Sequence, residues 1–165
     1  VVVPQHYTMH KSMHNIFNRK IFDITFNKDF YQVITTCKNI YRRDQQGTWI
    51  SDEIVEAYTR LHEMGLARSV EVWQKKKLVG GLYGVDIGNG IFCGESMFSK
   101  VSNASKVAFY TLLQDLKEKD YLLLDCQVYN EHLESLGAYE ILRSEYMKYL
   151  LEGNIRLRIK KMKAS

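Results

Sequence analysis

Apolar and polar positions alternate with two distinct periods along the chain, and the helical period is the clearer of the two. In SDEIVEAYTRLHEMG (51–65) apolar residues recur every three or four positions, with Ser51 where an N-cap is expected and Gly65 where the helix would end. A second apolar stripe, from Asn103 to Lys117, predicts another helix. The segment FDITFNKDFYQVITTCKNI (22–40) predicts a short strand followed by a helix.

Strands are predicted mainly in the second half of the chain. RSVEVWQ (68–74) and KLVGGLYGV (77–85) predict two strands joined by a lysine-rich turn at 75–77. A third strand is predicted around GIFCGE (90–95). YLLLDCQV (121–128) is a nearly continuous apolar run, which is typical of a strand buried on both faces.

The order of these elements predicts the fold class. Strand, helix, helix, hairpin strands, helix, buried strand and helix indicate an α/β (α+β) domain built around a largely antiparallel sheet. Short helices are expected at 131–151, whereas residues 1–20 look polar and irregular. Because the chain opens on Val1, residues 1–20 are interpreted as the remnant of an N-terminal region. Residues 21–152 are interpreted as the main domain, which would hold any active site, and 153–165 as a basic tail.

Composition limits the class of protein and locates its charge. The 165 residues are 45% hydrophobic and 25% charged, as in ordinary globular domains, and no apolar run approaches the roughly 18 residues of a membrane span. The net charge of +4 comes from residues 153–165, which hold five basic residues and no acidic one; the remainder has 18 basic and 19 acidic residues. Such a tail suits a phosphate backbone or a disordered end equally well.

Several kinds of site are excluded or disfavoured. Three cysteines without C-x-x-C spacing favour a reducing cytoplasm over a disulfide framework or a zinc site. His6, His10 and His14 have helical spacing, but no carboxylate joins them and no helical period supports them, so no metal is expected. The chain also lacks a P-loop, a G-x-S-x-G elbow and an H-E-x-x-H motif.

Polar side chains at the ends of predicted elements are the remaining candidates for chemistry. Glu95 stands among apolar neighbours, and Asp125 ends a run of leucines, where an unpaired carboxylate would be costly to bury. Alternation along a strand would put Asp125 and Gln127 on one face and Cys126 on the other. These residues could form a catalytic site or only a structural network, and spacing alone leaves both open.

Aromatic residues form a second set with two interpretations. They lie near the predicted strands and the helix facing them, where most aromatic side chains belong to a core. An apolar pocket with polar groups at its mouth is also the usual form of a ligand site. The members of this set are Trp49, Tyr58, Trp73, Tyr83, Phe92 and Phe98.

Short motifs that follow one another between about residue 20 and residue 150 carry a family resemblance. They are GTW (47–49), SVEVW (69–73), LVGGLYGV (78–85), GESMFS (94–99), NASK (103–106), DCQV (125–128) and HLESLGA (132–138). In this order they resemble the leucyl/phenylalanyl-tRNA–protein transferase family. The resemblance covers most of the chain.

The resemblance implies a GNAT-like acyltransferase fold and a reaction. Leucine or phenylalanine, with methionine as a third candidate, would move from aminoacyl-tRNA to the N-terminal Arg or Lys of an acceptor protein and mark that protein for degradation. The expected partners are Leu-tRNA, Phe-tRNA and such acceptor proteins in the cytoplasm, with no membrane. The ester is already activated by its tRNA, so no cofactor or metal is expected.

The same resemblance gives roles to the candidate polar residues. Gln127 would hold the attacking amine through its side-chain carbonyl oxygen, while Asp125 polarises or orients that amide. Glu95, together with Asp125, would supply negative charge to the cationic N-terminus of the acceptor. Proximity and orientation would then provide much of the acceleration.

The resemblance also places the donor pocket. Trp49 and Tyr58 match positions around the pocket for the leucyl or phenylalanyl side chain. Met97 and Phe98 are expected to help line it because they directly follow the Glu95 motif. Such a pocket would discriminate against β-branched side chains by shape, by only a few kcal/mol.

Contacts to tRNA are expected from basic residues near the N-terminus. Lys11, Arg19 and Lys20 are the candidates, together with the C-terminal tail. The chain departs from the family in its short N-terminal region and in Arg68, where a histidine is typical.

Two other functions are compatible with the residues. A GNAT-like N-acetyltransferase would need a Gln/Arg-x-x-Gly-x-Gly/Ala loop for pyrophosphate, which the chain lacks. A non-catalytic tRNA- or degron-binding module would keep the pockets without turnover, and the short N-terminus favours it. Retention of Glu95, Asp125 and Gln127 together favours the enzyme.

Overall fold

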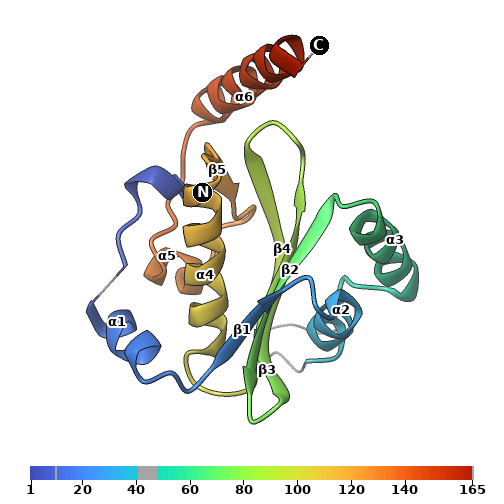
Figure 1. Ribbon diagram of the computed structural model, residues 1–165, viewed down its shortest axis with the longest axis vertical. Helices are drawn as coiled ribbons and strands as arrows, with labels where there is room; N and C mark the ends of the chain where they lie inside the picture. Colours follow the sequence, from blue (N-terminus) through green and yellow to red (C-terminus); the bar gives the residue numbers. More distant parts are fainter. Residues whose placement is uncertain (10, 41–47, 165) are drawn as a thin grey trace.

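The computed structural model describes residues 1–9, 11–40 and 48–164, and these form a five-stranded sheet with helices on both faces (Figure 1). The strands are β1 (Asp23–Phe26), β2 (Ala67–Gln74), β3 (Lys77–Asp86), β4 (Ile91–Ser99) and β5 (Leu123–Asp125). The helices are a 3₁₀ turn η1 (Pro4–His6), α1 (Lys11–Asn18), α2 (Phe30–Asn39), α3 (Asp52–Glu63), α4 (Ala104–Glu118), α5 (Glu131–Ser135) and α6 (Arg143–Ala164).

The strands lie in sequence order, and the predicted largely antiparallel sheet is confirmed. Strands β1 to β4 pair antiparallel, whereas β5 pairs parallel with β4 after the crossover through α4. The predicted lysine turn joins β2 to β3 through Lys75 and Lys76, whose φ angles of 50° and 62° are those of a two-residue type I′ turn. That turn matches the right-handed twist of the two strands it joins.

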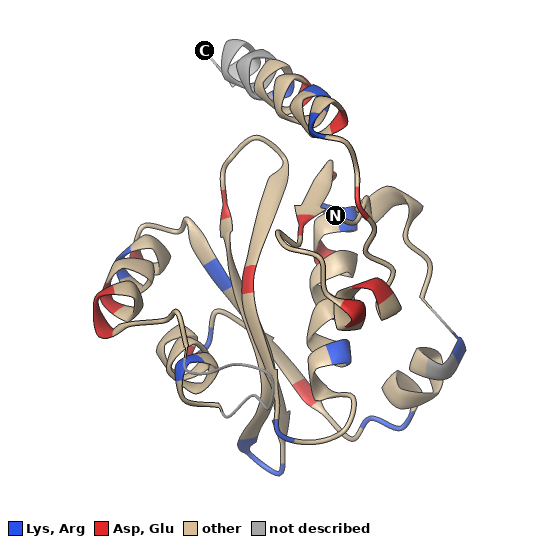
Figure 2. Cartoon of the chain, turned by 180° about the vertical axis from the view of Figure 1, so that it is seen from behind, with Lys and Arg blue, Asp and Glu red and all other residues tan. Residues whose placement is uncertain are grey.

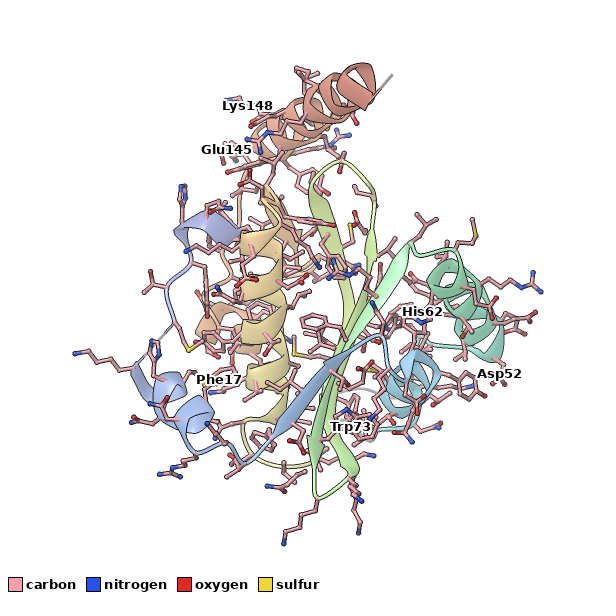
Figure 3. All side chains as sticks on the ribbon, viewed as in Figure 1. Phe17, Asp52, His62, Trp73, Glu145 and Lys148 are labelled. Carbon is pink, nitrogen blue, oxygen red and sulfur yellow. The ribbon has the colours of Figure 1, made fainter. Side chains whose placement is uncertain are left out.

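Layers of helices enclose the sheet on both faces (Figure 1). Helix α4 packs its buried face on one side, against β2, β3 and β4, and α1 lies beside it with Phe17 directed toward this core (Figure 3). Helices α2 and α3 cover the opposite side, where Tyr83 and Phe98 are buried beneath them. Helical and strand periods in the sequence therefore agree with the two faces that each element must bury.

A fully buried carboxylate holds the first strand and the second helix to the sheet. Glu71 on β2 is 0% exposed and accepts hydrogen bonds from the hydroxyls of Thr25 (2.6 Å) and Ser69 (2.5 Å). The backbone N–H groups of Lys28 and Asp29, just before α2, also donate to it at 3.3 and 3.5 Å. These donors offset the cost of burying a carboxyl group, which accounts for the glutamate at a buried position of β2.

The expectation that residues 1–20 are irregular is wrong. The backbone of Val2 makes two 2.8 Å hydrogen bonds with Leu124 of β5, and Met13 on α1 is buried in the core under α4. Ile16 and Phe17 pack against the same core, so the buried positions of α1 follow a helical period. This segment is therefore part of the domain and covers one edge of the sheet.

The C-terminal elements differ from the predicted short helices. Helix α5 is short, but α6 runs for 22 residues with no break at residue 152, and it projects beyond the sheet (Figure 1). Gly153 is buried where α6 crosses the β3–β4 hairpin, and a Cβ atom there would clash with the backbone of Asn89. Within the described part of the chain, no helix has the length and apolar character needed to cross a membrane.

Two glycines paired across β3 and β4 give a test of the packing near the bulge. A Cβ atom on Gly84 would clash with the carbonyl oxygen of Cys93 and lie 2.5 Å from the ring of Phe92. On its register partner Gly94, a Cβ atom would meet nothing closer than 3.5 Å. Gly84→Ala should therefore lower the free energy of unfolding by about 2–3 kcal/mol, and Gly94→Ala by less than about 1 kcal/mol, in urea titrations. Equal effects would contradict this packing.

Candidate active site

The site begins where β4 and β5 stop pairing. The parallel ladder between them ends at Cys93 and Asp125, after which β4 continues to Ser99 and the other chain segment turns away. On its other edge β4 has a bulge, because Gly94 and Ser96 pair with neighbouring residues of β3 and leave Glu95 without a register partner. A bulge re-aims the side chain of the extra residue, so Glu95 stands beside the gap between the strands.

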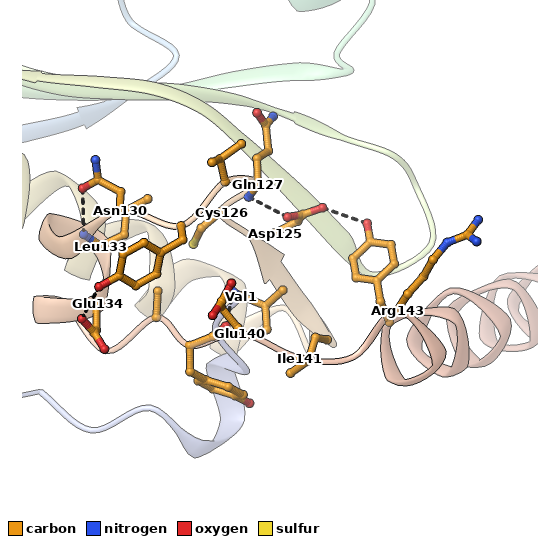
Figure 4. Close-up of a pocket in the computed structure, with 15 residues that line it drawn as sticks. Val1, Asp125, Cys126, Gln127, Asn130, Leu133, Glu134, Glu140, Ile141 and Arg143 are labelled. Carbon is orange, nitrogen blue, oxygen red and sulfur yellow. Dashed lines mark hydrogen bonds between the residues drawn. The ribbon is translucent and has the colours of Figure 1, made fainter. Parts of the chain in front are cut away.

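A tight turn at the end of β5 brings Asp125 and Gln127 together. The Oδ1 atom of Asp125 accepts the backbone N–H of Gln127 at 2.7 Å, and Gln127 adopts a left-handed φ of 62° (Figure 4). The predicted strand 121–128 is therefore too long, since β5 ends at Asp125. Asp125 and Gln127 lie close together because of this turn and not because of alternation along a strand. The short side chain of an aspartate can close such a turn by bonding the backbone two residues on.

The three polar candidates form a connected network. The Nε2 atom of Gln127 donates to Oε2 of Glu95 at 3.0 Å, and Oδ2 of Asp125 accepts the hydroxyl of Tyr146 at 2.9 Å. Since an ionised carboxylate only accepts, Glu95 fixes the amino end of the Gln127 amide. Among the described residues, Oε1 of Gln127 has no hydrogen-bond donor, so it can act as an acceptor. Asp125 was expected to polarise or orient that amide, and in the structure it contacts the backbone N–H of Gln127.

Burial raises the pKa values of two tyrosines and one cysteine beside the carboxylates. Burial, the charge of Glu95 and a hydrogen bond to it raise the pKa of Tyr58 to about 12. Burial, then the charges of Asp125 and Glu95, raises the pKa of the Cys93 thiol to about 11. Burial and the hydrogen bond to Asp125 also raise the pKa of Tyr146. Neither carboxylate takes part in an ion pair within the described ranges, although Arg143 and the Val1 ammonium line the cavity that Asp125 also lines.

A cavity of about 470 Å³ opens beside this network. Glu95 and Gln127 line it, with Trp49 and Asn130 also contributing to the wall. The apolar part of its wall comes from β3, β4, α4 and the segment around β5: Leu82, Met97, Phe109, Leu112, Leu124 and Leu133. Polar groups make up nearly as much of the wall as these apolar side chains, so the cavity suits a small ligand that has both an apolar and a polar part.

The predicted pocket aromatics lie in different places. Trp49 lines the cavity and is 47% exposed, and Met97 also lines it. Tyr58 lies on α3 and packs edge-on against Tyr83, with ring centroids 5.5 Å apart, so it approaches Glu95 from the other side of the sheet. Phe98 is only 3% exposed, belongs to the core under α2 and α3, and does not line the cavity.

A second cavity of about 450 Å³ lies against the same turn (Figure 4). Asp125 and Gln127 belong to its wall, together with Glu134 of α5, Glu140, and Arg143 at the start of α6. The two cavities meet at residues 126–130, so the polar network can be reached from both.

Basic residues near the N-terminus lie apart from α2 and α3. Lys11 is exposed on α1, and Arg19 and Lys20 are exposed in the segment that follows it. Figure 2 shows this basic segment beside α4, with acidic positions on α5.

His6 lies in η1 and His14 on α1, whereas His10 is outside the described residues. Where the chain is described, no three His, Cys, Asp or Glu side chains are grouped as metal ligands would be.

Two contributions to the site were not predicted from sequence. Phe109 and Leu112 on α4 line the cavity, although the stripe that contains Leu112 predicted only a core-facing helix. Tyr146 bonds Asp125 from 21 residues further along the chain. No local sequence pattern indicates a contact between residues that far apart in the chain. The apolar stripe on α4, in contrast, could be seen in the sequence.

The geometry accounts for the types of residue that are present. An available amide oxygen and two carboxylates without ion-pair partners in the described ranges can bind a primary ammonium or amine, and the neighbouring cavity can bind an apolar side chain. Comparison with known proteins identifies the family to which these features belong. The model of the leucyl/phenylalanyl-tRNA protein transferase family matches residues 1–151.

The chain belongs to the leucyl/phenylalanyl-tRNA–protein transferase family. It is 62% identical over 140 residues to the leucyl/phenylalanyl-tRNA–protein transferase of Flavobacterium johnsoniae, covering 85% of this chain and 66% of the relative. The corresponding protein of Flavobacterium psychrophilum is 58% identical over 139 residues, covering 84% and 65%. The chain thus spans just under two thirds of the length of these two relatives.

Solved structures confirm the predicted GNAT-like fold. An aminoglycoside acetyltransferase from an uncultured soil metagenomic sample, in complex with sisomicin, superposes with a TM-score of 0.58 at 14% identity, covering 75% of this chain and 93% of that one. The aminoglycoside acetyltransferase AAC(6′)-Iy gives a TM-score of 0.51 at 12% identity, covering 74% and 93%. At these identities the likeness extends to the fold alone.

The opposite faces of Met97 and Phe98 give a test of the cavity wall. Phe98→Ala should lower the free energy of unfolding by about 3–5 kcal/mol, because it leaves a void in a packed core. Met97→Ala should cost about 1 kcal/mol, because that side chain already borders open space. Urea unfolding of both variants measures the difference. A larger loss for Met97→Ala would contradict this assignment of faces.

Proposed function

We propose that the chain transfers leucine or phenylalanine from aminoacyl-tRNA to the N-terminal Arg or Lys of acceptor proteins, with methionine as a third donor side chain. Family membership supports the class of reaction. The single observation that carries the assignment to this site is the network of Glu95, Gln127 and Asp125 at the edge of a partly apolar cavity.

The donor side chain would bind in the cavity of about 470 Å³. Leu82, Phe109 and Leu112 surround it with apolar surface, and burying a leucyl or phenylalanyl group there is favourable by about 2–3 kcal/mol. Its ester carbonyl would then lie toward Glu95 and Gln127, at the polar end. The cavity would discriminate against β-branched side chains by shape, within the few kcal/mol that apolar pockets achieve.

The acceptor α-amine would be held by the available Oε1 of Gln127. An α-amine has a pKa near 8 and must lose its proton before it attacks the ester carbonyl carbon. Attack forms the new C–N bond, and collapse of the tetrahedral intermediate breaks the ester C–O bond to the ribose. The amine nitrogen loses a proton, and the departing ribose oxygen gains one. Glu95 and Asp125 hold the amide and the turn that carry Gln127, so orientation supplies the main part of this catalysis.

Selectivity for Arg or Lys at the acceptor N-terminus would follow from charge. Glu95 and Asp125 have no ion-pair partner among the described residues, and each lines a cavity at which the amine would arrive. A cationic side chain next to the reacting amine would bring the missing positive charge. Neutral N-terminal residues lack that contribution and would bind more weakly.

The tRNA would bind through phosphate contacts spread over basic residues. Lys11, Arg19 and Lys20 are exposed and able to contact an acceptor stem, and the sequence of α6 adds five more basic residues after position 152. Such contacts make binding steeply dependent on salt. A charged tRNA as the donor is consistent with the cytoplasmic location expected from sequence.

Transfer of label from radiolabelled Leu-tRNA to peptides tests this function. A peptide with N-terminal Arg should be labelled, and the same peptide with N-terminal Ala should not. Asp125→Ala should reduce transfer at least about 100-fold, because the turn that presents Gln127 would be lost. The matched control is Asp23→Ala, an exposed carboxylate on β1, which should leave the rate unchanged.

The contradicting results are distinct from one another. Retention of the wild-type rate by Asp125→Ala would overturn the assigned site. Binding of Leu-tRNA with no transfer to either peptide would overturn the enzyme and favour a tRNA- or degron-binding module.

A further inference from the structure

Both carboxylate oxygens of Asp125 are occupied, and each has a different partner. Oδ1 accepts the backbone N–H of Gln127 at 2.7 Å, whereas Oδ2 accepts the hydroxyl of Tyr146 at 2.9 Å (Figure 4). We infer that Tyr146 is a positioning residue for the transfer reaction, which fixes the Asp125 carboxylate so that the turn presents Gln127 in its productive geometry. This inference rests on the proposed function.

The hydroxyl can do this because α6 is itself held in place. Tyr149 and Leu150, on the next turn, pack against the small core formed by Ile91 and Leu123. Further along, Gly153 lies so close to the backbone of Asn89 that no side chain fits between them. The helix is therefore attached to β4, β5 and the β3–β4 hairpin, and its position sets the position of the phenol.

A tyrosine has a specific advantage over a charged donor at this place. Its pKa is raised by burial and by the hydrogen bond to Asp125, so it remains a neutral donor throughout the working pH range. Cys93 on β4 and Cys126 next to Asp125 also have pKa values raised by burial, to about 11 each, so they stay neutral as well. Tyr146 thus orders the carboxylate without cancelling the negative charge that it shares with Glu95.

Tyr146→Phe removes the hydroxyl and keeps the ring. The value of kcat should fall about tenfold or more, the contribution typical of a hydrogen bond to a charged group, while KM for both substrates stays within about twofold. A loss confined to kcat separates a positioning role from a loss of substrate affinity. Tyr149→Phe is the matched control, since that ring packs on the same helix against the core, and it should leave kcat unchanged.

A second measurement does not depend on activity. Amide hydrogen exchange of Gln127, followed by NMR, should be faster in Tyr146→Phe than in the wild type, while the amides of Val2 and Leu124 in the adjacent bridge keep their rates. An unchanged kcat together with an unchanged exchange rate of the Gln127 amide in Tyr146→Phe would overturn the inference. If the wild-type chain transfers nothing, the proposed function fails, and the exchange rates alone decide whether Tyr146 positions the turn.

Discussion

The hydrogen bond between Gln127 and Glu95 spans the gap that opens where β4 and β5 stop pairing, and the site depends on it. Its two residues are 32 positions apart in the chain, and each is presented by an irregularity of the sheet. A bulge frees Glu95 from the ladder with β3, and a left-handed residue follows the end of β5 at Gln127. Regular pairing through these positions would close the gap and leave neither side chain available.

The surrounding packing separates an apolar side of the site from a polar side. Helix α4 supplies the apolar wall through Phe109 and Leu112, because it crosses from the end of β4 to the start of β5 and must pack on both. The polar side is held from two other elements: Tyr58 approaches Glu95 from α3, and Tyr146 approaches Asp125 from α6. A donor with an apolar side chain and an acceptor with a cationic end would meet at the boundary between the two.

Local patterns predicted the elements whose residues bury one face. The helix at Asp52–Glu63 and its Ser51 cap, which accepts the N–H of Ile54, follow directly from the spacing of apolar residues. Helix α1 was missed, although Met13, Ile16 and Phe17 have helical spacing, because eight residues among polar neighbours give a weak signal.

The sequence motifs named three polar residues that lie together in the structure, but not the geometry that brings them together. Glu95, Asp125 and Gln127 were named from their motifs, and the structure brings them together. Alternation along a strand failed as the reason for the proximity of Asp125 and Gln127, because the apolar run continues past the last paired residue. Phe98 was assigned to the pocket from its place beside Met97, but adjacent residues of a strand face opposite sides.

The central claim is that Glu95 acts by holding the amide of Gln127, so the most direct test is a double-mutant cycle on the transfer rate. Glu95→Ala and Gln127→Ala should each reduce kcat about 100-fold. The double variant should be little slower than the slower of the two single variants, which corresponds to a coupling energy between the two residues well above about 1 kcal/mol. Losses that multiply in the double variant would mean that the two residues act independently. That result would contradict the dependence of the site on the hydrogen bond between them.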